Sequence, residues 1–319
     1  MHGVLSFFTD EGASNLAREV DWIFWGLTAL CGAVTLLVFV LIVVFGIRYR
    51  RGSGASREQR KGWSGRFLST SLEIGWTVVP LLIFLALFGW AADVFFRMSK
   101  PPANADEIYV VGKQWMWKLQ HTDGRREINE LHLPVGRPVK LVMTSQDVIH
   151  DFFVPAFRAK QDVLPGRYTT LWFTPTKPGK YHLFCSQYCG TNHSTMGGWV
   201  YVSEPEEHAR WLAQTSSPTS LAARGERIFH TLGCSGCHAP GSKIPAPLLD
   251  GIFGKSVPLS DGTFVRVDEQ YLRDSILLPN KQLAAGYAPL MPTFQNQISE
   301  DDLAALLAYL KSLGTAPHP

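Results

Sequence analysis

The sequence carries almost no excess of charge of either sign. Its 30 Lys and Arg residues stand against 27 Asp and Glu residues, a formal net charge of +3 spread over 319 residues. Nucleic-acid binding depends on clustered positive charge, so this small and evenly spread surplus predicts that the chain does not bind nucleic acid. Internal repeats and low-complexity tracts are also absent. The length suffices for two or three domains.

A positively charged leader is missing as well. The residues before Trp22 include one arginine and four acids: Arg18, Asp10, Glu11, Glu19 and Asp21. A secretory signal peptide begins with a positive segment. The first apolar run, which follows these residues, is therefore expected to be a retained helix and not a cleaved one.

Two long runs lack charge altogether. Residues 22–47 contain no charged side chain and exceed the roughly 20 apolar residues that a bilayer-spanning helix needs. Residues 74–92 are also uncharged and include Pro80, which a membrane-spanning helix tolerates better than a soluble one. A buried core helix of this length and uniformity is disfavoured. Both runs are expected to be transmembrane helices.

The loop between the two runs is basic. Residues 48–70 hold one acid, Glu58, and seven basic residues: Arg48, Arg50, Arg51, Arg57, Arg60, Lys61 and Arg66. A short loop this basic stays on the cytoplasmic side, so both termini are expected to face outward. The sequence therefore predicts an outer N-terminal segment, residues 1–21, and a transmembrane helical hairpin, residues 22–97.

After the hairpin the chain changes to short alternating apolar runs. Residues 98–204 contain runs such as 108–111 and 139–143, separated by breaks such as Asp123-Gly124 and Pro178-Gly179. This spacing is typical of an antiparallel β-sandwich or barrel. An all-β domain is expected here.

The last third of the chain has a helical pattern. Residues 205–220 are expected to form a linker. A short helix over residues 204–210 is expected at its beginning. Residues 221–319 are expected to form a separate small α domain. Its last helix begins after Ser299, a favourable N-cap residue, and Leu303 and Leu310 lie on its apolar stripe.

Cysteine is scarce, and the five copies divide into one lone residue and two pairs. Cys31 lies inside the first apolar run, where a lone cysteine is expected to pack as an apolar residue. Cys185 with Cys189, and Cys234 with Cys237, lie on the outward side. An oxidising compartment converts idle pairs into disulfides, whereas pairs held by metal or by heme escape that reaction.

The second pair stands in the segment Cys234-Ser-Gly-Cys237-His238, the attachment signature of a c-type heme. The two thiols bind the heme covalently, and the histidine becomes an axial ligand of the iron. Met291 is the candidate for the other axial position, with core packing as its alternative. Iron with His and Met ligands transfers electrons and binds no substrate.

The first pair belongs to a cluster of two cysteines, a histidine and a methionine: Cys185, Cys189, His193 and Met196. These soft and borderline donors suit copper and suit magnesium or calcium poorly. Methionine is not an expected ligand of structural zinc. The alternative is a disulfide between the two cysteines beside a surface histidine.

Two bridging thiolates can hold two copper ions, and such a pair needs a further histidine. The candidates from earlier in the chain are His121, His132, His150 and His182. The sequence context favours His150, because it directly follows a predicted strand in the segment Asp147-Val-Ile-His150.

Taken together, these features resemble subunit II of a heme-copper cytochrome c oxidase of the caa type, which has a cytochrome c domain fused at its C-terminus. The resemblance rests on the two helices, on Asp147-Val-Ile-His150, on Pro165-Gly-Arg167 and on the cysteine cluster. It implies a cupredoxin-like antiparallel β-sandwich with a binuclear CuA centre of two copper ions, and an all-α cytochrome c domain. The implied copper ligands are His150, Cys185, Cys189, His193, Met196 and the backbone carbonyl of Gln187.

Gln187 is where the chain departs from the family. The family has Glu at this position, and its side chain also reaches a magnesium ion at the interface with subunit I. A backbone carbonyl survives the exchange to Gln, but the neutral side chain is a weaker ligand for a hard cation. The magnesium contact is therefore expected to be weakened or lost.

Three more positions take roles from the resemblance. Trp115 matches the residue through which electrons enter from cytochrome c. The alternative role of both Trp115 and Trp117 is to pack in the core or to anchor the chain at the membrane interface. For Trp117 this alternative is favoured. Glu73 matches the carboxylate at the cytoplasmic mouth of a proton channel, with dipole stabilisation in the first turn of a helix as its alternative. Pro247 matches the proline whose carbonyl accepts a hydrogen bond from the axial histidine.

The resemblance implies an electron-transfer subunit of a respiratory terminal oxidase, part of a translocase complex, in a bacterial inner membrane. The implied partners are oxidase subunits I and III, membrane lipid, and an external donor: cytochrome c, another periplasmic redox protein or a quinol-oxidising complex. The alternatives are the equivalent CuA subunit of a nitric oxide reductase and, less favoured, a copper-binding assembly protein. The redox domains are expected on the periplasmic side.

Overall fold

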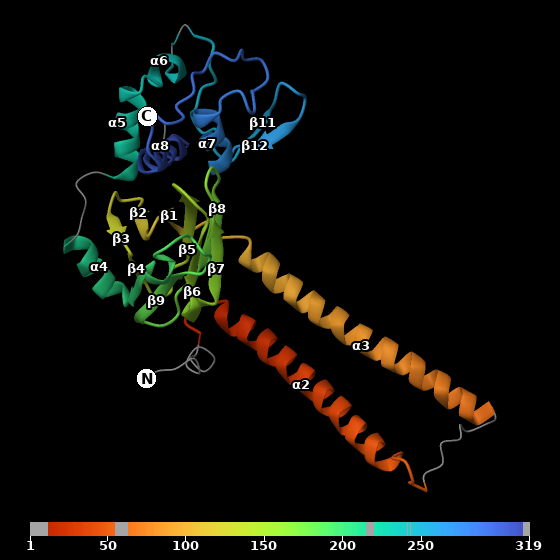
Figure 1. Ribbon diagram of the computed structural model, residues 1–319. Helices are drawn as coiled ribbons and strands as arrows, with labels where there is room; N and C mark the ends of the chain where they lie inside the picture. The colour runs from red at the N-terminus through yellow and green to blue at the C-terminus, as the bar shows by residue number, and fades with distance from the viewer. Residues whose placement is uncertain (1–11, 55–62, 215–219, 241, 243, 315–319) are drawn as a thin grey trace. The chain divides into compact units, whose positions relative to one another are not determined.

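The computed structural model describes residues 12–54, 63–214, 220–240, 242 and 244–314 (Figure 1). The chain forms two compact units. The smaller unit covers residues 16–100, and the larger one contains residues 1–15 and 101–319. Each unit is described by itself below.

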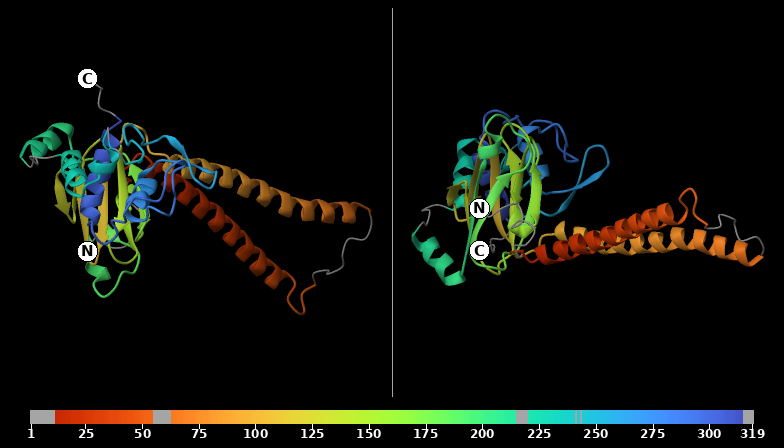
Figure 2. Two further views of the ribbon diagram at one scale, coloured as in Figure 1. Left: turned by 90° about the horizontal axis from the view of Figure 1, so that it is seen from above. Right: turned by 60° about the horizontal axis from the view of Figure 1, so that its bottom comes forward.

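The smaller unit is a helical hairpin of α2, Ala17–Arg48, and α3, Trp63–Met98 (Figure 2). Both helices are long and apolar enough to cross a membrane, and they exceed the predicted runs 22–47 and 74–92 at both ends. Glu19 and Arg97 form an ion pair that joins the end of α3 to the beginning of α2. Large apolar side chains are exposed along both helices, as expected of surfaces that face lipid.

Two expectations about this hairpin require correction. Glu73 does not lie in the first turn of its helix, because α3 begins at Trp63. The dipole acts within the first turn, so it does not account for an acid at this position. Cys31 is exposed on α2 and does not pack inside the chain.

The larger unit contains a β-sandwich of two five-stranded sheets. The first sheet has the order β3-β2-β1-β5-β8, and the second has the order β4-β10-β9-β6-β7. The strands of the first sheet are β1 Asp106–Lys113, β2 Met116–His121, β3 Arg126–Ile128, β5 Val139–Ser145 and β8 Thr169–Phe173. Those of the second are β4 Glu130–Pro134, β6 His150–Val154, β7 Ala159–Val163, β9 Gly179–Cys185 and β10 Gly197–Ser203.

The predicted sandwich is confirmed, but its sheets are not purely antiparallel. Strand β1 pairs with β5 in parallel, and β10 pairs with β4 in parallel. The reason lies in the path of the chain, which leaves the first sheet at β4 and returns to it at β5. Such a crossover lets two strands run in the same direction, whereas a short hairpin does not.

The core lies between the two sheets and is apolar. Trp117, Leu119, Leu141, Phe152 and Leu183 are among its fully buried side chains. The N-terminal segment also contributes, because Ala13 is buried in this core and its backbone pairs with Ala156 and Thr176. No pattern in the sequence predicted that part of segment 1–21 belongs to the sandwich.

The C-terminal domain is helical, as predicted. Its helices are α5 Leu221–Thr231, α6 Ser235–His238, α7 Glu269–Leu277 and α8 Glu300–Ser312. The Ser299 hydroxyl caps α8 by accepting a hydrogen bond from the Asp302 N–H at 3.1 Å. The expectation of an all-α domain needs one correction, since β11 Ser256–Pro258 and β12 Phe264–Arg266 form a small antiparallel hairpin.

Paired charges join the helical domain to the outer face of the first sheet. The ammonium groups of Lys140 and Lys311 lie 2.5 to 3.2 Å from carboxylate oxygens of Glu107 and Glu269. These four side chains are between 14% and 19% exposed. Attraction between such half-buried charges is stronger than between charges in open water. A buried apolar cluster of Tyr109, Val142, Leu221, Ala304 and Ala305 lies in the same contact, so charge and apolar packing both contribute to it.

A second charged cluster closes the other edge of the sandwich, where α4, Pro205–Gln214, packs. The Glu127 carboxylate accepts hydrogen bonds from His121 Nε2 at 2.6 Å and from His132 Nδ1 at 2.5 Å. Trp211 of α4 stacks on the His132 ring, with 4.4 Å between ring centroids. Burial alone would raise the pKa of Glu127, but the two histidines outweigh it and lower this pKa to about 2.

We predict that Glu127→Gln lowers the free energy of unfolding at neutral pH by about 2 kcal/mol. A carboxyl whose pKa is lowered in the folded state stabilises the fold above its unfolded pKa near 4.5. This stabilisation is lost as the pH falls from 4.5 towards 2. Thermal unfolding of the full chain in detergent, measured across this window, should show the variant and the wild type converging at the acid end. Glu206→Gln, an exposed acid of α4, should match the wild type throughout; equal stability of Glu127→Gln at pH 7 would contradict the prediction.

Candidate metal centre

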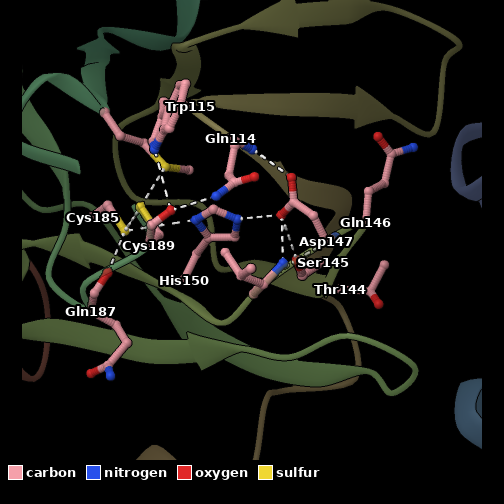
Figure 3. Close-up of polar contacts among 12 residues, drawn as sticks. Gln114, Trp115, Thr144, Ser145, Gln146, Asp147, His150, Cys185, Gln187 and Cys189 are labelled. Atoms are coloured by element: carbon pink, nitrogen blue, oxygen red, sulfur yellow. Dashed lines mark hydrogen bonds and ion pairs between the residues drawn. The ribbon is translucent and has the colours of Figure 1, made fainter. Parts of the chain in front are cut away.

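Five donor residues that the sequence singled out meet at one end of the sandwich, and Figure 3 shows His150, Cys185 and Cys189 among them. His150 begins β6 and Cys185 ends β9, whereas Cys189, His193 and Met196 lie in the loop that leads to β10. His150, Cys185 and Cys189 are buried, and their donor atoms lie within 4.8 Å of one another. The site is therefore shielded from water.

Sulfur atoms form the middle of this cluster. Cys189 Sγ lies 3.7 Å from Cys185 Sγ, 3.5 Å from His193 Nδ1 and 3.7 Å from Met196 Sδ. A disulfide would require about 2.05 Å between the two cysteine sulfurs, and both cysteines are free. Two thiolates that each bind one ion at about 2.3 Å in tetrahedral geometry lie about 3.8 Å apart. The observed spacing thus fits sulfurs that share a metal ion.

The remaining donors face the sulfur of Cys185. His150 Nδ1 lies 3.9 Å from Cys185 Sγ, and the carbonyl oxygen of Gln187 lies 3.2 Å from it. The side chain of Gln187 points away from the cluster (Figure 3). Only the backbone of this residue faces the donor atoms.

The two thiols differ in acidity because their neighbours differ. Burial would raise the pKa of Cys185, but hydrogen bonding to His150 and to backbone groups lowers it to about 7. Burial and the adjacent Cys185 raise the pKa of Cys189. One thiolate therefore forms readily near neutral pH, and the second needs the charge of a bound cation, because metal binding releases protons from its ligands.

Asp147 holds the imidazole of His150 in place, a role that the sequence analysis did not identify. Its Oδ1 accepts a hydrogen bond from His150 Nε2 at 2.8 Å and from the Val148 N–H at 2.7 Å. With Nε2 occupied by this bond, Nδ1 faces Cys185. Outer hydrogen bonds of this kind fix the tautomer and the orientation of a metal-binding histidine. The one sign of this role in the sequence is that Asp147 stands three residues before His150.

The two tryptophans of the segment 114–117 lie in different surroundings. Trp117 is fully buried in the core and packs edge-on against His150, with 5.9 Å between ring centroids. Trp115 is partly buried, and its Nε1 lies 3.3 Å from the carbonyl oxygen of Cys189. Trp117 is thus a core residue, whereas Trp115 borders the cysteine loop.

The C-terminal domain contains an apolar cavity of about 550 Å³. Cys234, Cys237 and His238 line it together with Met291. The carbonyl oxygen of Pro247 lies 2.8 Å from His238 Nδ1, which leaves Nε2 of this ring for a metal. The donor set and the apolar lining fit a heme.

Glu73 belongs to the smaller unit. It lies on α3, where its carboxylate accepts a hydrogen bond from Ser69 Oγ at 3.2 Å. The described residues of the larger unit form the metal cluster and the apolar cavity.

Comparisons with known proteins match both parts of the larger unit. Residues 125–202 match the family described as cytochrome C oxidase subunit II, periplasmic domain, and residues 222–314 match cytochrome c. Cytochrome c oxidase subunit 2 of Alkalihalophilus pseudofirmus is 30% identical over 294 residues, which cover 88% of this chain and 83% of the relative. That of Thermostichus vulcanus is 30% identical over 288 residues, covering 73% and 85%. The crystal structure of the periplasmic domain of cytochrome oxidase subunit II from Bradyrhizobium japonicum is 30% identical, with a TM-score of 0.35, and covers 36% of this chain and 96% of its own.

We predict that Gly190→Ala destabilises the fold by about 2 kcal/mol. Gly190 has φ +115°, and a Cβ atom there would lie 2.9 Å from Gln114 Nε2. Gly136 also has positive φ, at +78°, but a Cβ atom there would meet nothing within 4 Å. Thermal unfolding of both alanine variants should therefore show the larger loss for Gly190. If both variants are destabilised by the same amount, the close contact between Gly190 and the side chain of Gln114 does not constrain the loop.

Proposed function

Because the chain belongs to the cytochrome c oxidase subunit II family and carries a cytochrome c domain, we propose that it relays electrons to a terminal oxidase. An external donor would reduce a heme held by the C-terminal domain, the electron would pass to copper held by the sandwich, and a partner subunit would use it to reduce dioxygen to water. The observation that carries the proposal is the convergence of sulfur and imidazole donors at the buried end of the sandwich. This chain acts as an enzyme only within the complex.

The copper centre supplies one-electron chemistry, and the chain supplies its ligands. We assign two copper ions to His150, Cys185, Cys189, His193, Met196 and the carbonyl of Gln187. The distance of 3.7 Å between the cysteine sulfurs supports thiolates shared between ions. Burial limits the access of water to His150, Cys185, Cys189 and Met196, which favours electron transfer over reactions with solvent.

The heme supplies a second one-electron carrier. We assign its covalent attachment to Cys234 and Cys237 and its axial positions to His238 and Met291. The Pro247 carbonyl, 2.8 Å from His238 Nδ1, supports this assignment because it fixes the ring and makes it more basic.

Other roles of single residues follow from the same family. We assign to Trp115 the point where electrons enter from a cytochrome, supported by its contact with the Cys189 carbonyl. Glu73 is assigned to the cytoplasmic mouth of a proton channel in subunit I. A magnesium ion at the interface with subunit I would lack the carboxylate that the family uses, because residue 187 is a neutral Gln.

The proposal places the protein in a bacterial inner membrane as part of a translocase complex with oxidase subunits I and III. The donor is cytochrome c, another periplasmic redox protein or a quinol-oxidising complex. The proposed divisions are an outer segment 1–21, a membrane hairpin 22–97, a CuA domain 98–204, a linker 205–220 and a cytochrome c domain 221–319. The basic loop 48–70 faces the cytoplasm and both termini face the periplasm.

Two alternative functions use the same residues differently. The equivalent subunit of a nitric oxide reductase would carry the same copper donors, so the neighbouring subunit decides between the two. A copper-binding assembly protein would need accessible and exchangeable copper. The burial of Cys185, Cys189 and Met196 disfavours this second alternative.

We predict that the purified chain binds two copper ions that share one unpaired electron, together with one heme. Metal analysis, electron paramagnetic resonance and heme absorption test this. Cys189→Ser should abolish the shared-electron signal and leave the heme absorption, because it removes one bridging sulfur. Cys31→Ser changes a residue that is distant in sequence from both sites, so this variant should keep both signals. One isolated copper ion or a zinc ion in the wild type would contradict the proposal.

We predict that cutting the linker near Ser217, which lies outside the described residues, slows steady-state oxygen consumption by the assembled oxidase. A short flexible tether holds its domain at an effective concentration on the order of mM. After the cut, the separated domain must find its place again, and attraction between Lys140 and Lys311 on one side and Glu107 and Glu269 on the other assists this step. Salt screens these charges while they are exposed to solvent. Turnover of the cut oxidase should therefore fall as ionic strength rises, whereas the same oxidase with its engineered cleavage site uncut should respond little. Salt-independent turnover after the cut would count against the heme domain as the obligatory donor.

A further inference from the structure

We propose that Gln114 is the positioning residue of the copper centre, because its backbone and its side chain tie together the two chain segments that supply the ligands. The inference rests on the copper function proposed above. It concerns how the sandwich holds His150 and the cysteine loop at a fixed distance from each other before and after metal binds.

The backbone of Gln114 reaches the His150 segment. Its N–H donates a hydrogen bond to Asp147 Oδ2 at 2.8 Å, and the other oxygen of the same carboxylate accepts the bond from His150 Nε2 at 2.8 Å. Asp147 also accepts from the Val148 N–H and from the Ser145 hydroxyl. The carboxylate thus has a donor on each side, and it cannot rotate without breaking one of these bonds.

The side chain of Gln114 reaches the cysteine loop. Its Nε2 donates a hydrogen bond to the carbonyl oxygen of Cys189 at 2.8 Å, and Trp115 Nε1 lies 3.3 Å from the same oxygen (Figure 3). The loop approaches so closely that a Cβ atom at Gly190 would lie 2.9 Å from the amide nitrogen of Gln114. Cys189 is the residue whose sulfur contacts Cys185, His193 and Met196.

Gln114 itself stands on a fixed support. It lies between β1 and β2, which pair from Lys113 with Met116 to Ile108 with His121. The Gly112 carbonyl accepts a hydrogen bond from the Gln146 N–H at 3.0 Å. A Cβ atom at Gly112 would lie 3.0 Å from the His150 ring. This corner of the first sheet therefore lies against both ligand segments of the second sheet.

Removing the side-chain amide hydrogens should loosen one ligand segment and spare the other. In Gln114→Glu the backbone N–H still holds Asp147 and His150, but a carboxylate oxygen replaces the donor that faced the Cys189 carbonyl. The carbonyl then keeps only the longer contact with Trp115. Loss of such an outer hydrogen bond changes metal affinity by about 10- to 100-fold. We therefore expect faster copper release, with the cysteine side of the centre disturbed more than the histidine side.

The experiment compares Gln114→Glu with Gln146→Glu in the full chain purified with its copper. Gln146 carries the same amide on a neighbouring segment, but its side chain points away from the cluster (Figure 3). We expect copper release to a chelator to become at least about 10-fold faster in Gln114→Glu and to stay unchanged in Gln146→Glu. The electron paramagnetic resonance spectrum should change in Gln114→Glu alone.

A measurement on the metal-free chain separates positioning from general destabilisation. Cys189 is 3% exposed, so its alkylation reports how often the loop opens. Gln114→Glu should speed alkylation of Cys189 while thermal unfolding of the metal-free chain stays close to that of Gln146→Glu. Wild-type rates of copper release and of alkylation in Gln114→Glu would overturn the inference while the copper function stands. A wild-type chain that binds no copper pair would instead overturn the proposed function.

Discussion

Strand pairing in the second sheet is the constraint on which the metal centre depends. The donors are spread from residue 150 to residue 196, and sheet order places β9 between β6 and β10. Phe152 pairs with Cys185, and Phe184 pairs with Gly197. His150 and Cys185 are therefore at the ends of neighbouring strands, about 5 Å apart in a sheet. The loop that carries Cys189, His193 and Met196 is anchored at both ends by the paired strands β9 and β10.

The second constraint is that the first sheet closes the site from the other side. Gly112 lets the His150 ring lie against β1, where a Cβ atom would come within 3.0 Å of it. Asp147 follows β5 and Gln114 follows β1, both strands of the first sheet. The ligands thus come from one sheet and the groups that orient them come from the other. Slippage of one sheet against the other would disturb the ligands and their hydrogen bonds together.

Local patterns in the sequence were enough to identify the chemistry. The segment Cys234–His238 is a contiguous motif, and the cysteine cluster lies within a short stretch, so both could be found without knowing the fold. The alternation of apolar and polar residues, together with the turn residues between the runs, predicted the β-sandwich. The two apolar runs predicted both long helices, although each helix extends beyond the predicted bounds.

Features that depend on distant pairing could not be predicted in this way. The parallel pairing of β1 with β5 follows from a crossover between sheets, and the burial of Ala13 follows from contacts more than 140 residues away in the chain, with Ala156. Helix α7 lies in a region rich in Gly and Pro, where its cap Asp268 was not recognised. Asp147 and Gln114 are polar residues with no motif of their own. Their roles become visible only when strands β1, β5 and β6 are placed together.

Rigidity of the donors connects this architecture to electron transfer. A redox centre reacts quickly when its ligands move little between the two oxidation states, because movement adds to the barrier. Here the His150 ring is fixed by Asp147, the Cys189 carbonyl is fixed by Gln114, and Met196 is 2% exposed in the core. The proposed heme would be held differently, by the thiols of Cys234 and Cys237 and by His238, whose ring contacts the Pro247 carbonyl. Hydrogen bonds around the donors of the sandwich and covalent attachment in the C-terminal domain would thus meet the same physical requirement.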